Sequence, residues 1–446
     1  MIKKNNFFIK VLIIVNVYLL LSAPIMSETV RKLTIVTPYP PETSNLFKIA
    51  FEYKYPEIKI EIIKKNTNSA LKYIEETKDN NIADIFWASS PDAFEVLKGK
   101  NLLLQYSKKI DGIPKKIASF IVNDSEHYYK GFAAAGYGIM ENTHYMNALK
   151  LPVATQWDDL KKSIYYNHIG MSSPSRSGTT HLTVETLLQG EGWEKGWASW
   201  KEIAGNVKTI TQKSYHVPKG VNKGEFGIGI VIDFMGLSYK SMGFPIDFHY
   251  PMITTLVPSS IAIIKNAANK KAAQDFINFV LSDTGQKILL NPKISRLPIK
   301  EKAYDDAPKD YPNLFKNTKI GSKVVFDVNL SKKRYNVINS LFDIMITYNL
   351  EQLKAAFLAI HEAERVKNKS LEAKVLINQA RALVAKVPID MIKASDKDFN
   401  AIFTKSRKKL STKITGRQAK IEDLWNQEVK GNYNQAVELA KEARWL

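Results

Sequence analysis

Short apolar runs alternate with amphipathic stretches over the first part of the chain. Residues 33–38 (LTIVTP) and 58–65 (IKIEIIKK) predict buried strands, and residues 45–55 between them have apolar positions at helical spacing. Residues 83–97 (ADIFWASSPDAFEVL) predict a third strand that runs into a helix. This alternation is typical of an α/β protein with a largely parallel sheet and helices on its faces.

The same alternation continues and then gives way to helix alone near residue 331. A second series begins near residues 131–142, with further strands predicted at 168–173, 225–234 and 259–266 and one helix at 269–290. Trp193, Trp197 and Trp200 have helical spacing, and we expect them in a core rather than in a sugar-binding platform.

The first 27 residues have the layout of a secretory signal peptide. Three lysines precede an apolar run from Val11 to Ala23, and small and polar residues follow. The run is short for a membrane span, which needs about 20 residues, so a retained anchor is the weaker alternative. We expect export to the bacterial periplasm. The chain has no cysteine, which excludes disulfides, thiol catalysis and cysteine-ligated metal.

The formal net charge of +20 at pH 7 favours anionic partners. Because export separates the protein from nucleic acid, we expect no nucleic-acid partner, and phosphorylated solutes or lipid headgroups fit better. The basic run between Lys405 and Lys420 either docks an acidic partner or forms a solvated helix face.

A run of hydroxyl side chains, one arginine and one glycine stands where a strand gives way to a helix. It comprises Ser175, Arg176, Ser177, Gly178, Thr179 and Thr180. Unpaired N–H groups and a partial positive charge at a helix N-terminus attract anions, and arginine and hydroxyl groups add donors. Since the Gly-Lys-Ser/Thr of a P-loop is absent, the run predicts an anion site without metal. Alternatively, Ser177 or Thr179 only caps the helix.

Hydroxyl groups also follow two other predicted strands. Thr37 ends the first strand, and Ser89 and Ser90 end the third. Ligands of open α/β sheets collect beyond the carboxyl ends of the strands, so the three loops together predict a concave polar site.

Four segments resemble the bacterial periplasmic solute-binding proteins grouped with the ferric-iron binders. They are LTIVTPYPPE, ADIFWASSPDAFEVL, SSPSRSGTTHLTVETLLQGEGWEKGW and VPSSIAIIKNAANKKAAQDFINFVLSDTGQKILL, and the resemblance covers about residues 31–390. Within this group the chain is most similar to the regulatory proteins of phosphoglycerate transport and their hexose-phosphate-binding relatives. The resemblance places a phosphate loop on Pro174, Ser175, Ser177, Gly178 and Thr179.

The resemblance implies a two-lobed type 2 periplasmic-binding-protein fold with a C-terminal α-helical extension. The expected parts are a signal peptide (1–27), a first lobe (28–133 and 250–330), a second lobe (134–249) and the helical extension (331–446). It further implies a receptor, not an enzyme, that closes over a small phosphorylated anion and presents it to a membrane sensor kinase or ABC permease. We expect a monomer with no cofactor and no metal.

The chain departs from the ferric-iron-binding members at one position. Those relatives have adjacent tyrosines after a late strand of the second lobe, whereas this chain has Asp233 and Phe234. Hard Fe³⁺ prefers grouped anionic oxygen ligands, so a ferric-iron receptor remains the alternative rather than the first choice. Asp233 is expected to accept hydrogen bonds from ligand hydroxyls or to act as a helix cap.

Two enzymatic interpretations and one structural interpretation are weaker. Ser177 and His181 could pair in a phosphohydrolase, but the Gly-x-Ser-x-Gly elbow is absent. The motif HEAER at His361 has Arg365 where a zinc hydrolase needs its second histidine. A structural or adhesion protein with an active basic tail is the third class.

Overall fold

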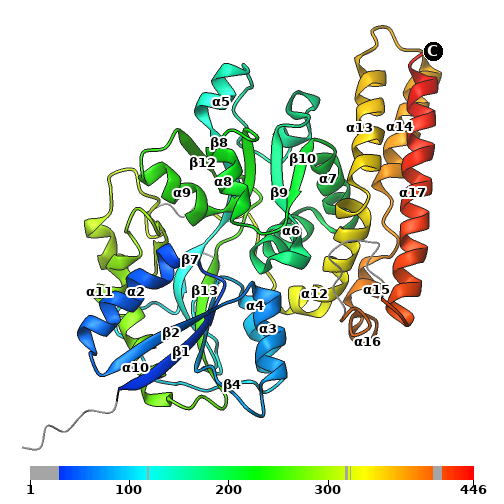
Figure 1. The fold of residues 1–446 in the computed structure, drawn as a ribbon. Helices are drawn as coiled ribbons and strands as arrows, with labels where there is room; N and C mark the ends of the chain where they lie inside the picture. The colour runs from blue at the N-terminus through cyan, green and yellow to red at the C-terminus, as the bar shows by residue number, and fades with distance from the viewer. Residues whose placement is uncertain (1–29, 118–119, 317–319, 322, 405–413) are drawn as a thin grey trace, which may run out of the picture.

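The computed structural model describes residues 30–446 except 118–119, 317–319, 322 and 405–413. The chain forms two sheets with helices packed on them and a bundle of long helices beside the second sheet (Figure 1). The predicted signal peptide and the greater part of the basic run lie outside the described residues. Within the described ranges, none of the helices has the length and apolar character that a membrane crossing requires.

The first sheet combines strands from both ends of the α/β region. Its order is β14 (Leu297–Pro298), β7 (Lys130–Ala135), β13 (Val257–Ile264), β3 (Ile85–Ala88), β1 (Arg31–Thr37) and β2 (Ile58–Lys64), with β4 (Leu103–Leu104) paired to β13. β1 is parallel to β2 and β3, whereas β13 is antiparallel to β3 and β7. Strand β3 is buried on both faces, as the predicted helical cover requires. The helices of this part are α2 (Pro41–Lys54), α3 (Thr67–Glu76), α4 (Pro91–Gly99), α10 (Lys270–Val280), α11 (Asp283–Ile288) and a 3₁₀ turn (Glu301–Asp306).

The second sheet is formed by the middle of the chain. Its order is β10 (Val207–Thr211), β9 (Ile169–Ser172), β11 (Ile228–Ile232), β8 (Tyr137–Asn142) and β12 (Ile246–His249). Strand β8 is antiparallel to both of its neighbours, and the other pairs are parallel. The helices are α5 (Thr143–Ala148), α6 (Gly178–Glu191), α7 (Trp193–Gly205), α8 (His216–Asn222) and α9 (Asp233–Ser241), with 3₁₀ turns at Asp159–Lys161, Ser163–Tyr165 and Pro174–Arg176. A separate hairpin pairs β5 (Lys116–Ile117) with β6 (Phe120–Ile121).

The chain passes between the sheets at two adjacent points. It leaves the first sheet at Gly136, between β7 and β8, and returns through residues 250–256, between β12 and β13. These crossings touch, because a Cβ atom on Gly136 would lie 2.8 Å from the ring of Tyr250. We call each sheet with its helices a lobe. The predicted lobe boundaries, at 133/134 and 249/250, stay predictions about which segments move together.

The helical extension shares one hydrophobic core with the second lobe. It consists of α12 (Val328–Phe342), a π turn (Asp343–Thr347), α13 (Leu350–Arg365), α14 (Leu371–Ala385), α15 (Met391–Ser395), α16 (Lys397–Asn400) and α17 (Arg417–Ala443). Buried residues of α12, α13, α14 and α17 belong to the same cluster as Trp193, Trp197 and Trp200 of α7. The prediction that these tryptophans lie in a core is therefore confirmed. Figure 1 shows the bundle standing beside the second lobe.

Two predicted elements were wrong in their extent. The helix predicted at 269–290 is interrupted, because Ser282 adopts extended backbone angles and its Oγ accepts the N–H of Gly285 to start a new helix. The strand predicted at 225–234 stops at Ile232, since the Asp233 carboxylate accepts the N–H of Phe234 at the start of α9. Both breaks use side-chain-to-backbone hydrogen bonds that compete with a continuous element.

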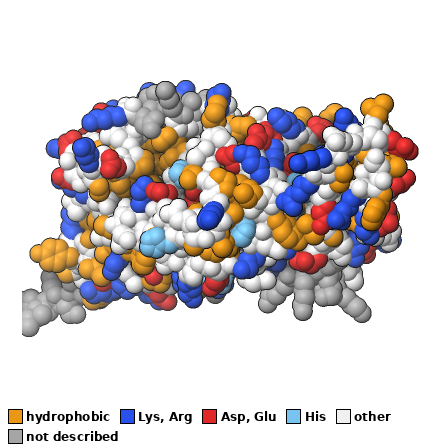
Figure 2. Space-filling model, turned by 90° about the horizontal axis from the view of Figure 1, so that it is seen from above, with side chains coloured by type: hydrophobic (Ala, Val, Ile, Leu, Met, Phe, Trp, Pro, Cys, Tyr) orange, Lys and Arg blue, Asp and Glu red, His pale blue; other side chains and the backbone are white. Residues whose placement is uncertain are grey.

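Charge is distributed rather than gathered on the face that Figure 2 displays. Lysine and arginine side chains are interspersed there with acidic, apolar and neutral polar ones. On this face the net charge of +20 does not form a single-sign band of the kind that tracks a nucleic-acid backbone.

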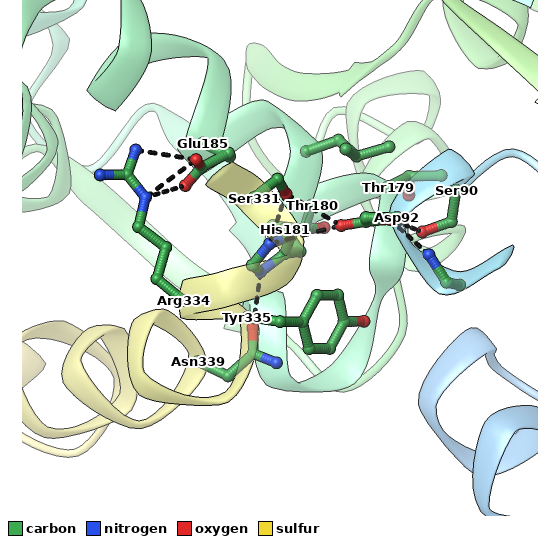
Figure 3. A network of polar contacts seen from close by, with 12 residues as sticks. Ser90, Asp92, Thr179, Thr180, His181, Glu185, Ser331, Arg334, Tyr335 and Asn339 are labelled. Carbon is green, nitrogen blue, oxygen red and sulfur yellow. Dashed lines mark hydrogen bonds and ion pairs between the residues drawn. The ribbon is translucent and has the colours of Figure 1, made fainter. Parts of the chain in front are cut away.

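A buried ion pair fastens α12 to α6. Arg334 donates from Nη2 and Nε to the carboxylate of Glu185 at 2.7 to 3.2 Å, and both side chains are almost fully enclosed (Figure 3). Removing one member of a buried pair leaves an uncompensated charge, which costs about 3–5 kcal/mol. We expect Arg334→Met to lower the free energy of unfolding by about this amount in urea titrations, and Glu185→Leu combined with Arg334→Met to recover most of it.

An exposed pair elsewhere in the helical extension is the matched control. Arg444 binds Glu362 at 2.7 Å with both side chains largely open to solvent. Arg444→Met should cost less than about 1 kcal/mol. Equal losses from Arg334→Met and Arg444→Met would contradict the role given to the buried pair.

Candidate functional site

A buried arginine lies between the two lobes. Arg296, just before β14, is fully buried, and its Nη1 donates to the hydroxyl oxygens of Ser89 and Ser259 at 2.9 and 3.1 Å. Its guanidinium carbon lies 4.2 Å from the ring centroid of Tyr39 in the first lobe and 3.7 Å from that of Phe234 in the second. One cation therefore contacts both lobes. We call these five residues the arginine cluster.

The remaining N–H groups of this guanidinium lack acceptors in the part of the chain that the structure describes. Nε and Nη2 of Arg296 are buried and make no hydrogen bond there, and neither does the hydroxyl of Tyr137 in β8. Burial lowers the pKa of Arg296, because water no longer solvates its charge. Buried donors without acceptors are costly, and the fork of a guanidinium matches the oxygens of phosphate or carboxylate. The arginine cluster is thus chemically suited to an anion.

The acid that interacts with Arg296 is Asp233, and its oxygens are already occupied. One oxygen accepts the N–H of Gly136 at 2.7 Å and the hydroxyl of Tyr250 at 3.0 Å, and the other accepts the N–H of Phe234 at 2.7 Å. Burial raises the pKa of Asp233 to about 6 despite these bonds. Asp233 therefore holds the two crossings together, and it is the first residue of α9, whose N-cap is Ile232.

The predicted loop begins α6 with a conventional cap. Ser177 is the N-cap residue, and its Oγ accepts the N–H of Thr180 at 3.3 Å and shares a hydrogen bond with the Thr179 hydroxyl at 2.7 Å. The hydroxyls of Ser177 and Thr179 are therefore bound to each other at the helix entrance. The capping interpretation accounts for Ser177, and a role for the loop in ligand binding stays a prediction.

The loop's arginine is directed toward the second sheet. Arg176 donates from Nη1 to the carbonyl oxygen of Thr211 in β10 at 3.2 Å. The Ser175 hydroxyl shares a hydrogen bond with that of Ser173 at 2.8 Å, and the Ser175 carbonyl accepts the side-chain amide of Asn68 from the first lobe at 2.8 Å. In this arrangement Arg176 does not join the arginine cluster, and Ser175 contributes to a contact between the lobes.

The lobes meet directly at Gly178. A Cβ atom there would lie 2.6 Å from the Ser90 hydroxyl oxygen and 2.9 Å from a methyl carbon of Thr67. The Ser90 hydroxyl in turn donates to Asp92 at 2.7 Å. Only glycine fits at this contact, so the loop of residues 174–179 lies directly against the first lobe. We call the contact of Gly178 with Ser90 and Thr67 the seam.

Thr37 has a structural role. Its hydroxyl donates to the Trp87 carbonyl and accepts the N–H of Tyr39, which fixes the turn that positions the Tyr39 ring.

A buried histidine connects the seam to the helical extension. His181 of α6 lies 3.4 Å from an oxygen of Asp92 in α4, and its two ring nitrogens contact Ser331 and Asn339 of α12 at 3.3 and 3.0 Å (Figure 3). The backbone N–H of His181 donates to the Ser177 carbonyl at 2.9 Å, as in any helix, but among the described residues no side-chain hydrogen bond joins the imidazole to the Ser177 hydroxyl. The pairing that a Ser/His phosphohydrolase needs is therefore missing from this arrangement.

No metal centre is evident among the described residues. There, no group of three or more histidine, aspartate or glutamate side chains is placed to hold a metal ion. His361 of the HEAER motif instead contacts Glu364 at 3.2 Å, one turn along α13.

The family is decided by the sequence profile described as bacterial extracellular solute-binding protein, which matches residues 80–319. The chain belongs to this family. Among its relatives is the phosphoglycerate transport regulatory protein PgtC of Salmonella typhimurium, 27% identical over 374 residues, or 84% of this chain and 90% of that protein. The PgtC of Salmonella typhi matches to the same extent.

Solved structures of solute-binding proteins have the same fold. The periplasmic binding protein AfuA of Actinobacillus pleuropneumoniae, with fructose-6-phosphate bound, is 23% identical, with a TM-score of 0.62 over 70% of this chain and 98% of that one. The apo ferric ion-binding protein A of Pasteurella haemolytica is 16% identical, with a TM-score of 0.56 over 70% and 97%. The predicted two-lobed type 2 periplasmic-binding-protein fold with a helical extension is confirmed.

The predicted site residues fall into separate groups in this member of the family. Ser89 lies in the arginine cluster, and Asp233 lies beside it. Ser90 and Gly178 meet at the seam, while Arg176 lies apart. Sequence reasoning missed Arg296 entirely. The available signal was a single arginine inside the apolar run ISRLPI, a position where charge is unusual.

The buried carboxyl of Asp233 gives a testable pH dependence. Its folded-state pKa, about 6, lies above the ordinary 3.8, so the folded protein retains a proton that the unfolded chain releases. Stability contributed by this group is therefore full below about pH 4 and is lost as the pH rises toward 6. Asp233→Asn cannot titrate, so its free energy of unfolding should fall less steeply across this window in urea titrations. The exposed Asp79→Asn serves as control. Parallel curves for wild type and Asp233→Asn would show that burial does not perturb this carboxyl.

Proposed function

We propose that this protein is an exported receptor that captures a small phosphorylated metabolite between its lobes in the periplasm. The candidate solutes are phosphoglycerate-like acids and sugar phosphates. The solute-bound form is then presented to a membrane partner, a sensor kinase or an ABC permease. The receptor class follows the family, and the similarity to PgtC, a phosphoglycerate transport regulatory protein, supports the regulatory branch of this proposal.

The observation that carries the proposal is the unpaired guanidinium of Arg296. It is a buried cation with free N–H donors in the described structure, and the hydroxyls of Ser89 and Ser259 lie against it. A phosphoryl oxygen at this point would accept hydrogen bonds from the remaining N–H groups of Arg296, in surroundings from which water is largely excluded. Charged hydrogen bonds in such surroundings are the strong ones.

The family-like loop has a closing role in this proposal. Ser175 and Gly178 of the second lobe contact Asn68 and Ser90 of the first lobe. Because these contacts join residues from opposite sides, they form only when the lobes approach each other. A solute that binds Arg296 and Phe234 together favours the same approach, which is the hinge closure expected of a two-lobed receptor.

Calorimetric titration of Arg296→Met tests this function. Wild type should bind at least one of 2-phosphoglycerate, 3-phosphoglycerate, phosphoenolpyruvate, glucose 6-phosphate and fructose 6-phosphate. The variant should bind it at least about a hundredfold more weakly, because each hydrogen bond to a charged group contributes about 1.5–3 kcal/mol and two are lost. Methionine keeps the contacts with the Tyr39 and Phe234 rings, so the ligand-free variant should unfold within about 1.5 kcal/mol of wild type.

Lys300→Met is the matched control for this experiment. Lys300 lies four positions along the chain and binds Asp283, away from the arginine cluster. The Lys300→Met variant should bind the phosphorylated solute with wild-type affinity. If wild type binds none of the phosphorylated solutes but binds ferric citrate tightly, the proposal is overturned in favour of an iron receptor. If Arg296→Met binds the solute with wild-type affinity, Arg296 is not the residue that binds it.

A further inference from the structure

Three lysines from the two lobes converge on one tyrosine ring. The Nζ atoms of Lys64, Lys213 and Lys219 lie 5.4, 5.6 and 5.5 Å from the ring centroid of Tyr215. Lys64 ends strand β2 of the first lobe, whereas the other two flank or belong to α8 of the second. We call these four residues the lysine rim.

The positive charges of the rim are poorly compensated. In the described part of the chain neither Lys213 nor Lys219 forms an ion pair with a carboxylate, and Lys64 donates only to the carbonyl oxygen of Tyr39 at 3.1 Å. Partial burial and the two neighbouring ammonium groups lower the pKa of Lys64, and the carboxylate of Glu42 opposes that shift. Like charges gathered from two lobes repel each other, so this arrangement favours an anion between them.

Tyr39 joins the lysine rim to the arginine cluster. Its carbonyl oxygen binds Lys64, its ring lies against the guanidinium of Arg296, and its hydroxyl shares a hydrogen bond with Ser89 at 2.7 Å. One residue thus contacts both cationic groups, Lys64 through its backbone carbonyl and Arg296 through its ring. Tyr39 is therefore the link between the two cationic groups.

We propose that the lysine rim is a second anion-binding site, formed by both lobes, that receives a carboxylate at the far end of the solute. The inference rests on the proposed function, in which Arg296 takes the phosphoryl group. It identifies the preferred solutes as small phosphorylated molecules with a second, separate negative group. Because Lys64 comes from one lobe and Lys213 and Lys219 from the other, this second group also stabilises closure.

The test compares two solutes that differ in one negative group. 3-Phosphoglycerate has a phosphoryl group and a carboxylate, whereas glycerol 3-phosphate has only the phosphoryl group. We expect wild type to prefer 3-phosphoglycerate in calorimetric titrations. In the Lys213→Ala, Lys219→Ala double variant, the ratio of the affinity for 3-phosphoglycerate to that for glycerol 3-phosphate should fall about tenfold. The preference of wild type should also weaken with added salt, because the rim is open to solvent.

A charge-matched control separates the rim from net charge. Lys195 and Lys208 are exposed lysines of the same lobe, on α7 and β10. The Lys195→Ala, Lys208→Ala double variant has the same total charge as the rim variant and should keep the wild-type ratio. An equal fall of the ratio in both double variants would overturn the rim as a site, as would a ratio that the rim variant leaves unchanged.

Failure of the inference and failure of the proposed function give different results. If wild type binds glycerol 3-phosphate and 3-phosphoglycerate equally well, the receptor function stands and the second anion site is wrong. If wild type binds none of the phosphorylated solutes, the receptor function for phosphorylated metabolites falls, and the rim proposal falls with it.

Discussion

The enclosure of a cation between two lobes, without a carboxylate bonded to it, is the constraint on which this structure depends. Arg296 is held by two serine hydroxyls and two aromatic rings, and its other donors lack acceptors in the described chain. Asp233 acts on it only through its field, because both oxygens of Asp233 are used at the crossings. A buried charge without a partner is costly. An anion that accepts hydrogen bonds from Arg296 therefore removes much of that cost. In the proposed receptor, binding the solute and closing the lobes are therefore one event.

Helix α12 extends this coupling to the C-terminal bundle. It belongs to the second lobe through the shared core and the Arg334–Glu185 pair, yet Ser331 binds Asp92 of the first lobe at 3.2 Å. Tyr335 of α12 also donates to Asn68, and Lys332 pairs with Glu95 at 3.7 Å, so α12 contacts the first lobe at several points. Helix α12 is thus bonded to both lobes, while its apolar residues share a core with the second. In the proposed receptor, opening of the lobes would therefore have to break the contacts of α12 with one of them.

Sequence reasoning predicted the parts of this protein that depend on local pattern. Apolar runs identified strands such as β1 and β3, and hydroxyl residues before an apolar helix identified the entrance of α6. The orientation of Arg176 could not be predicted, because the carbonyl that it binds, in Thr211, belongs to a strand that pairs with β9 only in the folded sheet. Arg296 was missed for the same reason: its burial depends on Tyr39 and Phe234, which are distant in sequence. Long-range packing, not composition, decides which cation is left without a partner.

The two cationic sites differ in how far their influence reaches, and this difference gives each a separate role in the proposed receptor. Arg296 is fully buried, so it acts over hydrogen-bond distances and selects the shape of the group that it binds. The rim lysines are exposed, so their field extends over about 10 Å at moderate salt and attracts anions before contact. Tyr39 contacts both sites, Lys64 through its backbone carbonyl and Arg296 through its ring. In the proposed receptor, this residue therefore links the two sites, and its position is fixed by the Thr37 turn at the end of β1.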